Sequence, residues 1–106
     1  DIEEVPTERV KVAILKLDDT RIELMEPTSD DSPIKKFLTD RGEGIHHVAI
    51  TADDIDNDVE RAIANGTRMI GNIRTGSYGR KITFIHPKSM NGVLTEFCQA
   101  PPGNKE

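Results

Sequence analysis

The stretch Ile45-His-His-Val-Ala-Ile-Thr51 opens the part of the sequence that decides the fold. Its apolar residues predict a β-strand, and Asp53 or Asp54 is a suitable N-cap for the helix that should follow. Apolar side chains then recur at helical spacing as far as Gly66, which predicts that the helix ends at this glycine. A strand followed by a helix is the first half of a βαβββ unit.

The residues after this helix predict three further strands. They are expected at 67–73, 81–85 and 93–99, separated by turns that contain glycine. Residues 45–99 therefore predict one complete βαβββ unit. The remaining residues, 100–106, are rich in proline, glycine and charge, and we expect them to form a frayed tail.

Residues 1–40 predict part of a second unit of the same kind. A hairpin is expected from strands at 10–17 and 20–26, followed by a helix at 33–40 with Ser32 as its N-cap and a proline at its first position. The predicted order for the whole chain is therefore β-β-α-β-α-β-β-β. This order predicts a single α+β domain over residues 1–106.

A weak internal repeat supports two modules. Lys11-Val-Ala-Ile-Leu15 with Ile22-Glu-Leu24 resembles Lys81-Ile-Thr-Phe-Ile85 with Thr95-Glu-Phe97, although the two lysine-to-glutamate separations differ by three residues. The comparison suggests homologous modules, of which the first lacks its opening strand and helix.

Composition excludes several classes of protein. A formal charge of −5 argues against nucleic acid binding, which needs a concentrated basic face. No apolar run approaches the ~20 residues of a membrane span, and no targeting peptide is visible. The single cysteine, Cys98, excludes an internal disulfide framework and is compatible with a reducing intracellular compartment. The expected localisation is the cytoplasm, or the mitochondrial matrix if the source is eukaryotic.

Three polar residues in apolar strands are candidate metal ligands. Neighbouring residues in a strand face opposite sides, so only one of His46 and His47 is expected to point into a given cavity. Glu96 interrupts a strand that should be buried, where a carboxylate is costly unless it is paired or bound to metal, and Glu23 occupies the matching place in the first module. Two carboxylates and an imidazole suit a divalent cation. The alternatives are a structural histidine and edge strands with solvated carboxylates.

The loop His86-Pro-Lys-Ser89 is a candidate anion contact through Lys88 and backbone amides, or else a polar turn closed by Asn91-Gly92. Other basic residues are also possible phosphate contacts but are more typical of surface charges: Lys35, Lys36, Arg74, Arg80 and Lys81. Cys98 shares a strand with Glu96 and has no evident activating base, so we interpret it as a core residue and not as a nucleophile.

Several motifs in order along the chain resemble the methylmalonyl-CoA epimerases of the vicinal-oxygen-chelate superfamily. The resemblance covers Val5 to Gln99 and rests on the following stretches: Gly42-Glu-Gly-Ile-His-His-Val-Ala-Ile50, Asp53-Asp-Ile55, Phe84-Ile-His-Pro-Lys-Ser89, Asn91-Gly-Val-Leu-Thr-Glu-Phe97 and Ile22-Glu-Leu-Met-Glu-Pro27 with Asp31-Ser-Pro-Ile34.

This resemblance implies glyoxalase-like βαβββ modules that form a curved mixed sheet around one divalent metal ion, with cobalt, manganese, nickel or zinc as candidates. It implies Glu23, His47 and Glu96 as metal ligands. The fourth family ligand, a histidine on the first strand of the first module, has no counterpart, which predicts a truncated first module over residues 1–40 beside the complete one at 45–99.

The implied activity is epimerisation of methylmalonyl-CoA between its (R) and (S) forms through an enolate, with Glu96 as a catalytic base. Lys88, Ser89 and His46 are the candidate substrate-binding residues, a CoA thioester is the expected partner, and family habit implies a homodimer. The competing hypotheses are a glyoxalase-type lyase or isomerase and a non-catalytic ligand-binding module of the same superfamily.

Overall fold

The computed structural model describes residues 1–102, which form two compact units. Residues 1–44 and 76–78 belong to the first unit, and residues 45–75 and 79–102 belong to the second. The strands are β1 (Ile2–Val5), β2 (Val10–Leu17), β3 (Thr20–Pro27), β4 (Val48–Thr51), β5 (Met69–Thr75), β6 (Lys81–Ile85) and β7 (Thr95–Gln99). The helices are α1 (Pro33–Arg41) and α2 (Ile55–Ala64), with short 3-10 turns at Ser77–Gly79 and Pro87–Ser89.

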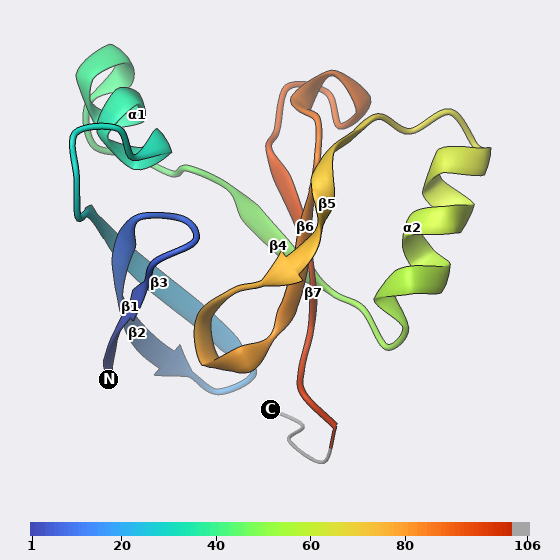
Figure 1. The fold of residues 1–106 in the computed structure, drawn as a ribbon, viewed down its shortest axis with the longest axis horizontal. Coiled ribbons are helices and arrows are strands. Elements are labelled where there is room, and N and C mark those ends of the chain that lie inside the picture. Colours follow the sequence, from blue (N-terminus) through green and yellow to red (C-terminus); the bar gives the residue numbers. More distant parts are fainter. Residues whose placement is uncertain (103–106) are drawn as a thin grey trace. The chain divides into compact units, whose positions relative to one another are not determined.

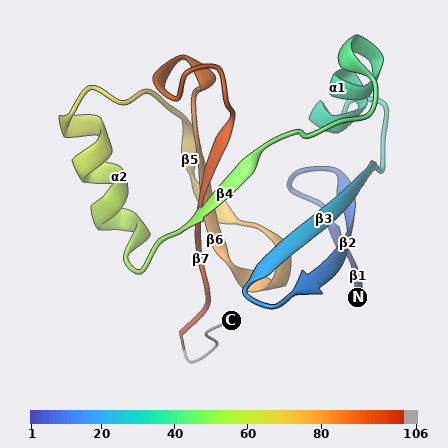
Figure 2. The same cartoon turned by 180° about the vertical axis from the view of Figure 1, so that it is seen from behind.

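The first unit is an antiparallel sheet in the order β1-β2-β3, with α1 following β3 (Figure 2). Its core is a cluster of aliphatic side chains from the sheet and the helix: Val5, Val10, Val12 and Ile34, with Ile14, Met25 and Leu38 packed against them. Burial of these apolar side chains stabilises the unit. Helix α1 begins where the sequence predicts, because Ser32 is its N-cap and accepts a hydrogen bond from the backbone nitrogen of Ile34.

The second unit is a four-stranded sheet in the order β4-β7-β6-β5, with α2 beside it (Figure 1). Strand β4 runs parallel to β7, whereas β7, β6 and β5 are antiparallel neighbours. Ile55, the first residue of α2, is fully buried, and its backbone nitrogen donates a hydrogen bond to Oε1 of Gln99 on β7. The helix is therefore anchored to the sheet at its N-terminus.

The predicted α+β class is confirmed, and most predicted elements exist with shifts of a few residues at their ends. One strand was missed. Ile2-Glu-Glu-Val5 has only two apolar residues, and its strand structure comes from pairing with β2, from Ile2 opposite Ala13 to Val5 opposite Val10. The predicted tail at 100–106 lies mostly outside the described residues.

The strand predicted at 45–51 is shorter than expected, and this changes the interpretation of its histidines. Strand β4 begins at Val48, whose parallel partner Thr95 is the first residue of β7. Ile45, His46 and His47 precede this pairing and have no strand structure. The strand assignment of residues 45–47 was therefore wrong, and the alternation of faces that was its basis applies only to extended, paired residues.

Neither helix in the part of the chain that the structure describes has the length and apolarity that a membrane crossing requires.

Candidate active site

His47 and Glu96 lie side by side in the second unit. Nε2 of His47 is 2.9 Å from Oε1 of Glu96, and the two side chains are only 14% and 13% exposed. The parallel register brings the two segments together, because Glu96 is opposite Ala49 and His47 directly precedes the first residue of β4. The structure thus brings together two of the three predicted metal ligands.

His46 extends this contact into a chain of three side chains. Its Nδ1 lies 2.9 Å from Nδ1 of His47, and the two rings meet edge to face at 88° with their centroids 5.2 Å apart. Each ring nitrogen of His47 therefore has a polar neighbour, His46 on one side and Glu96 on the other. This arrangement fixes the orientation of the His47 ring.

An aromatic side chain that the sequence did not single out lies beside the pair. Phe84 is opposite Glu96 in the β6–β7 register, and its ring meets that of His47 edge to face with centroids 5.4 Å apart. The guanidinium carbon of Arg74 lies 5.1 Å from the Phe84 centroid, a distance that permits a cation–π interaction. Pairing β6 with β7 in the correct register would have revealed Phe84, but the sequence alone does not show that register.

Glu23 belongs to the first unit, where it lies on β3 opposite Ile14. It shares a strand face with Met25, two residues along, which packs against the core cluster. The alternation along β3 supports this placement, since Glu23 and Met25 are partly buried whereas Ile22 and Leu24 are exposed. Glu23 is thus a partly buried carboxylate, as its place in an apolar strand suggested.

The chemistry of the His47–Glu96 pair fits a divalent metal ion. An imidazole nitrogen and a carboxylate oxygen are both common ligands of first-row metals. Residues 1–102 contain no group of three or more His, Cys, Asp or Glu side chains gathered closely enough to hold a metal. Among the described residues of the second unit, His47 and Glu96 are thus two candidate metal ligands that lie together.

The loop after β6 has a defined structure. His86 caps the short turn Pro87–Ser89 through its Nδ1, which accepts a hydrogen bond from the backbone nitrogen of Lys88 at 3.0 Å. Ser89 Oγ accepts a hydrogen bond of 2.9 Å from the backbone nitrogen of Arg68. Lys88 and Ser89 are both exposed, so this side of the loop is accessible to solvent.

Cys98 and Arg80 are buried next to the site. Burial and then the negative charge of Glu96 raise the pKa of the Cys98 thiol, which agrees with its interpretation as a core residue. Arg80 is only 4% exposed, so its prediction as a surface charge was wrong. Its guanidinium acts in the opposite direction and lowers the pKa of Cys98, which places it near that thiol.

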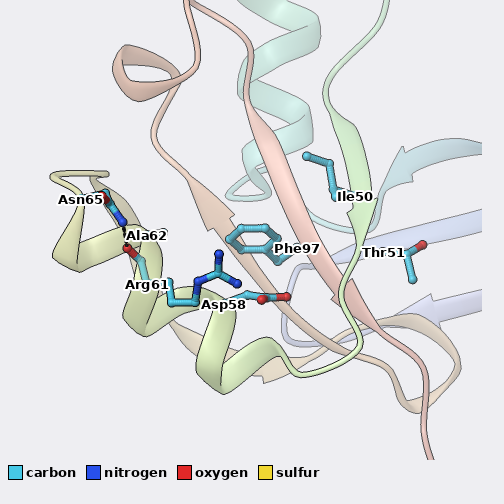
Figure 3. A pocket seen from close by; sticks show the side chains of 7 residues that line it. All are labelled: Ile50, Thr51, Asp58, Arg61, Ala62, Asn65 and Phe97. Atoms are coloured by element: carbon cyan, nitrogen blue, oxygen red, sulfur yellow. Dashed lines mark hydrogen bonds between the residues drawn. The ribbon is translucent and has the colours of Figure 1, made fainter.

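A hollow of about 370 Å³ lies on the other side of β7 (Figure 3). It is lined by Ile50, Thr51, Asp58, Arg61, Ala62, Asn65 and Phe97. Phe97 follows Glu96 in β7, and successive strand residues face opposite sides of a sheet. The hollow between α2 and the sheet is therefore separate from the His47–Glu96 pair.

Comparison with known proteins agrees with this fold. Residues 1–84 match the family described as the Glyoxalase/Bleomycin resistance protein/Dioxygenase superfamily. The mitochondrial methylmalonyl-CoA epimerase of Dictyostelium discoideum is 42% identical over 89 residues, covering 82% of this chain and 54% of the relative. The chain thus spans about half the length of that relative.

Two bacterial proteins match over more of their length. The ethylmalonyl-CoA/methylmalonyl-CoA epimerase of Cereibacter sphaeroides is 36% identical, with 89% of this chain and 72% of that protein covered. A variant of the Streptomyces coelicolor methylmalonyl-CoA epimerase, solved in complex with 2-nitronate-propionyl-CoA, aligns with a TM-score of 0.93 and 36% identity over 100% of this chain and 78% of that one. The chain belongs to the Glyoxalase/Bleomycin resistance protein/Dioxygenase superfamily and, within it, to the family of the methylmalonyl-CoA epimerases.

Proposed function

We propose that this protein epimerises methylmalonyl-CoA between its (R) and (S) forms. The observation that carries the proposal is the contact between His47 Nε2 and Glu96 Oε1, two largely buried side chains. It places a carboxylate beside an imidazole nitrogen, a common metal ligand. Relatives of this chain that are named methylmalonyl-CoA epimerases support the choice of substrate. The substrate is thus a CoA thioester with a carboxylate on its α-carbon.

Glu96 is the proposed catalytic base. The α-carbon lies between a thioester and a carboxylate, so removal of its proton by Glu96 from one face leaves an enolate. A second acid on the opposite face, distinct from Glu96, then returns a proton and inverts the centre. A carboxylate accepts such a proton when it is held close to the α-carbon and shielded from bulk water. Glu96 meets the second condition, since 13% of its side chain is exposed.

The proposed metal ligands are Glu23, His47 and Glu96. His47 and Glu96 are adjacent in the second unit, and Glu23 is partly buried on β3 in the first. A bound divalent cation, with cobalt, manganese, nickel or zinc as candidates, supplies positive charge that stabilises negative charge on the substrate oxygens. His46 holds the ring of His47, and Lys88 and Ser89 are proposed contacts of the substrate.

A homodimer belongs to the same proposal. Strand β4 is an edge of the four-stranded sheet, and edge strands favour pairing with another chain. Sedimentation of the purified protein tests this part, and a monomer at all concentrations contradicts it.

The experiment that tests the activity is deuterium exchange at the α-carbon of methylmalonyl-CoA, followed by mass spectrometry. We expect metal-loaded wild-type protein to exchange this proton, and the Glu96→Gln variant to exchange it at least ~100-fold more slowly, as expected for loss of a general base. Glu60→Gln, which removes an exposed carboxylate on α2, is the matched control and should exchange at the wild-type rate.

Three results would contradict the proposal. Binding of substrate without exchange at any metal loading indicates a ligand-binding module. Turnover of the hemithioacetal of methylglyoxal without exchange on methylmalonyl-CoA indicates a glyoxalase-type enzyme. Equal rates for wild type and Glu96→Gln exclude Glu96 as the base.

A further inference from the structure

Two basic residues of the loop after β6, His86 and Lys88, are joined to a third, Arg68, through backbone hydrogen bonds. The backbone nitrogen of His86 donates a hydrogen bond of 2.8 Å to the carbonyl oxygen of Arg68. In return, the backbone nitrogen of Arg68 donates to Ser89 Oγ at 2.9 Å. These two bonds tie the start of β5 to the loop, so that Arg68, His86 and Lys88 form one group, the Arg68 cluster.

The Arg68 cluster is positively charged and open to solvent. Arg68 and Lys88 are exposed and His86 is half-buried. Partial burial and then the charges of Arg68 and Lys88 lower the pKa of His86, so both cations act on this ring. Because His86 Nδ1 already accepts a hydrogen bond from the backbone of Lys88, the proton of the neutral ring is on Nε2. The cluster thus offers donors from a guanidinium, an ammonium and an imidazole.

The cluster lies at the same end of the sheet as the His47–Glu96 pair. Met69, Ile85, Thr95 and Val48 are successive partners across β5, β6, β7 and β4. One residue beyond these partners, the carbonyl oxygen of Arg68 accepts a hydrogen bond from the backbone nitrogen of His86. In the same way, the carbonyl oxygen of Leu94 accepts one from the backbone nitrogen of Val48, the residue after His47. The cluster and His47 therefore lie at the same end of the sheet, with the start of β7 between them.

The two sites also share a face of the sheet. His86 is two residues after Phe84, and Phe84 contacts the ring of His47. Residues two apart in extended backbone lie on one face. A ligand bound at Glu96 can thus extend toward the Arg68 cluster across the same face.

We propose that Arg68, His86 and Lys88 bind the phosphate groups of the CoA part of the substrate. This inference rests on the proposed function and extends it to a second contact region. Guanidinium and ammonium groups form strong charge-assisted hydrogen bonds with phosphate oxygens. A local basic group is needed because the chain carries a net charge of −5, which disfavours an anionic ligand elsewhere. The nucleotide end of CoA carries phosphates, whereas its pantetheine arm is uncharged.

The test compares two substrates in the metal-loaded enzyme, methylmalonyl-CoA and the truncated methylmalonyl-pantetheine, which lacks phosphate. We expect Arg68→Gln with Lys88→Gln to raise the KM for methylmalonyl-CoA by about tenfold or more, as for loss of charge-assisted hydrogen bonds, with little change in kcat. The KM for methylmalonyl-pantetheine should be unchanged. Lys81→Gln is the control, since Lys81 lies at the other end of β6 and pairs with Asp56.

An equal rise in KM for both substrates overturns the proposal, because it shows that the cluster affects the acyl or pantetheine part that both substrates share. An unchanged KM for methylmalonyl-CoA also overturns it. If neither substrate turns over, the proposed function fails separately, and calorimetric titration with CoA alone then decides. Weaker CoA binding by the double variant than by wild type and Lys81→Gln supports the Arg68 cluster, whereas equal or undetectable binding contradicts it.

Discussion

Nδ1 of His46 and Nδ1 of His47 lie 2.9 Å apart, so one ring must donate a proton to the other. The other nitrogen of His47, Nε2, faces Glu96. For Nε2 to be a metal ligand, the proton of His47 must be on Nδ1, where His46 can accept it. His46 is thus suited to select the tautomer of His47 that binds metal.

We therefore expect His46→Phe to weaken binding of a divalent metal by about 10- to 100-fold, the usual effect of losing a partner of a ligating histidine. Competition of the purified protein with a chromophoric chelator for cobalt measures this affinity. His46→Gln, which keeps a hydrogen-bond acceptor, should recover part of the loss. Unaltered affinity in His46→Phe would exclude this role.

Ile55 anchors α2, because its side chain is completely buried and its backbone nitrogen bonds to Gln99. Replacement by alanine removes three carbon atoms from the core, and we expect a loss of about 2–5 kcal/mol in the free energy of unfolding. Urea denaturation measures this change. The matched variant Ile55→Val removes one carbon and should cost about 0.5–1.5 kcal/mol. If Ile55→Ala lowers the free energy of unfolding no more than Ile55→Val does, the structure tolerates the larger cavity and the prediction fails.

Ser32 is the N-cap of α1, and only 2% of the residue is exposed. Ser32→Ala leaves the backbone nitrogen of Ile34 without its acceptor, so we expect the free energy of unfolding to fall by about 1 kcal/mol. Thr28→Ala, at an exposed position before the helix, should change it by less than about 0.5 kcal/mol. Equilibrium denaturation of both variants tests the difference, and an equal effect would show that capping does not contribute.

The pKa of His86 should lie below the ordinary histidine value of 6.5, because partial burial and then Arg68 and Lys88 disfavour the protonated ring. The folded state therefore binds a proton at His86 less readily than the unfolded state. As the pH falls below 6.5, this difference destabilises the fold, and it has no effect at higher pH.

An NMR titration of the His86 ring protons measures this pKa directly. Lys88→Gln should move the midpoint up toward 6.5, because one of the two cations is removed. Saturating CoA should also raise it if phosphates bind here. A midpoint above 6.5 in the free wild-type protein would contradict the charge arrangement of the cluster.

The elements with strong local signals could be predicted from the sequence. The N-cap at Ser32 and the alternating or continuous apolar strands at Val10–Leu17 and Lys81–Ile85 are short-range features, so neighbouring residues suffice to specify them. The choice of Glu96 as a candidate had the same basis, since a carboxylate in an apolar strand is conspicuous without any knowledge of its partner.

Contacts between distant residues depended on the tertiary structure. Strand β1 exists because it pairs with β2, and β4 begins at Val48 because its partner β7 begins at Thr95. The contacts of His47 with Glu96 and with Phe84 depend on the pairing of β7 with β4 and with β6. The sequence did not single out Arg68, whose backbone bonds to His86 and Ser89 exist only in the tertiary structure.

The sequence by itself thus determined the family, the α+β class and the kinds of side chain in the candidate site, because local patterns and motifs carry this information. The tertiary structure decided which side chains meet, because strand register and the end of a strand are set by hydrogen bonds to residues far along the chain. His47 and Glu96 are 49 positions apart, and only the parallel pairing of β4 with β7 places their side-chain atoms 2.9 Å from each other.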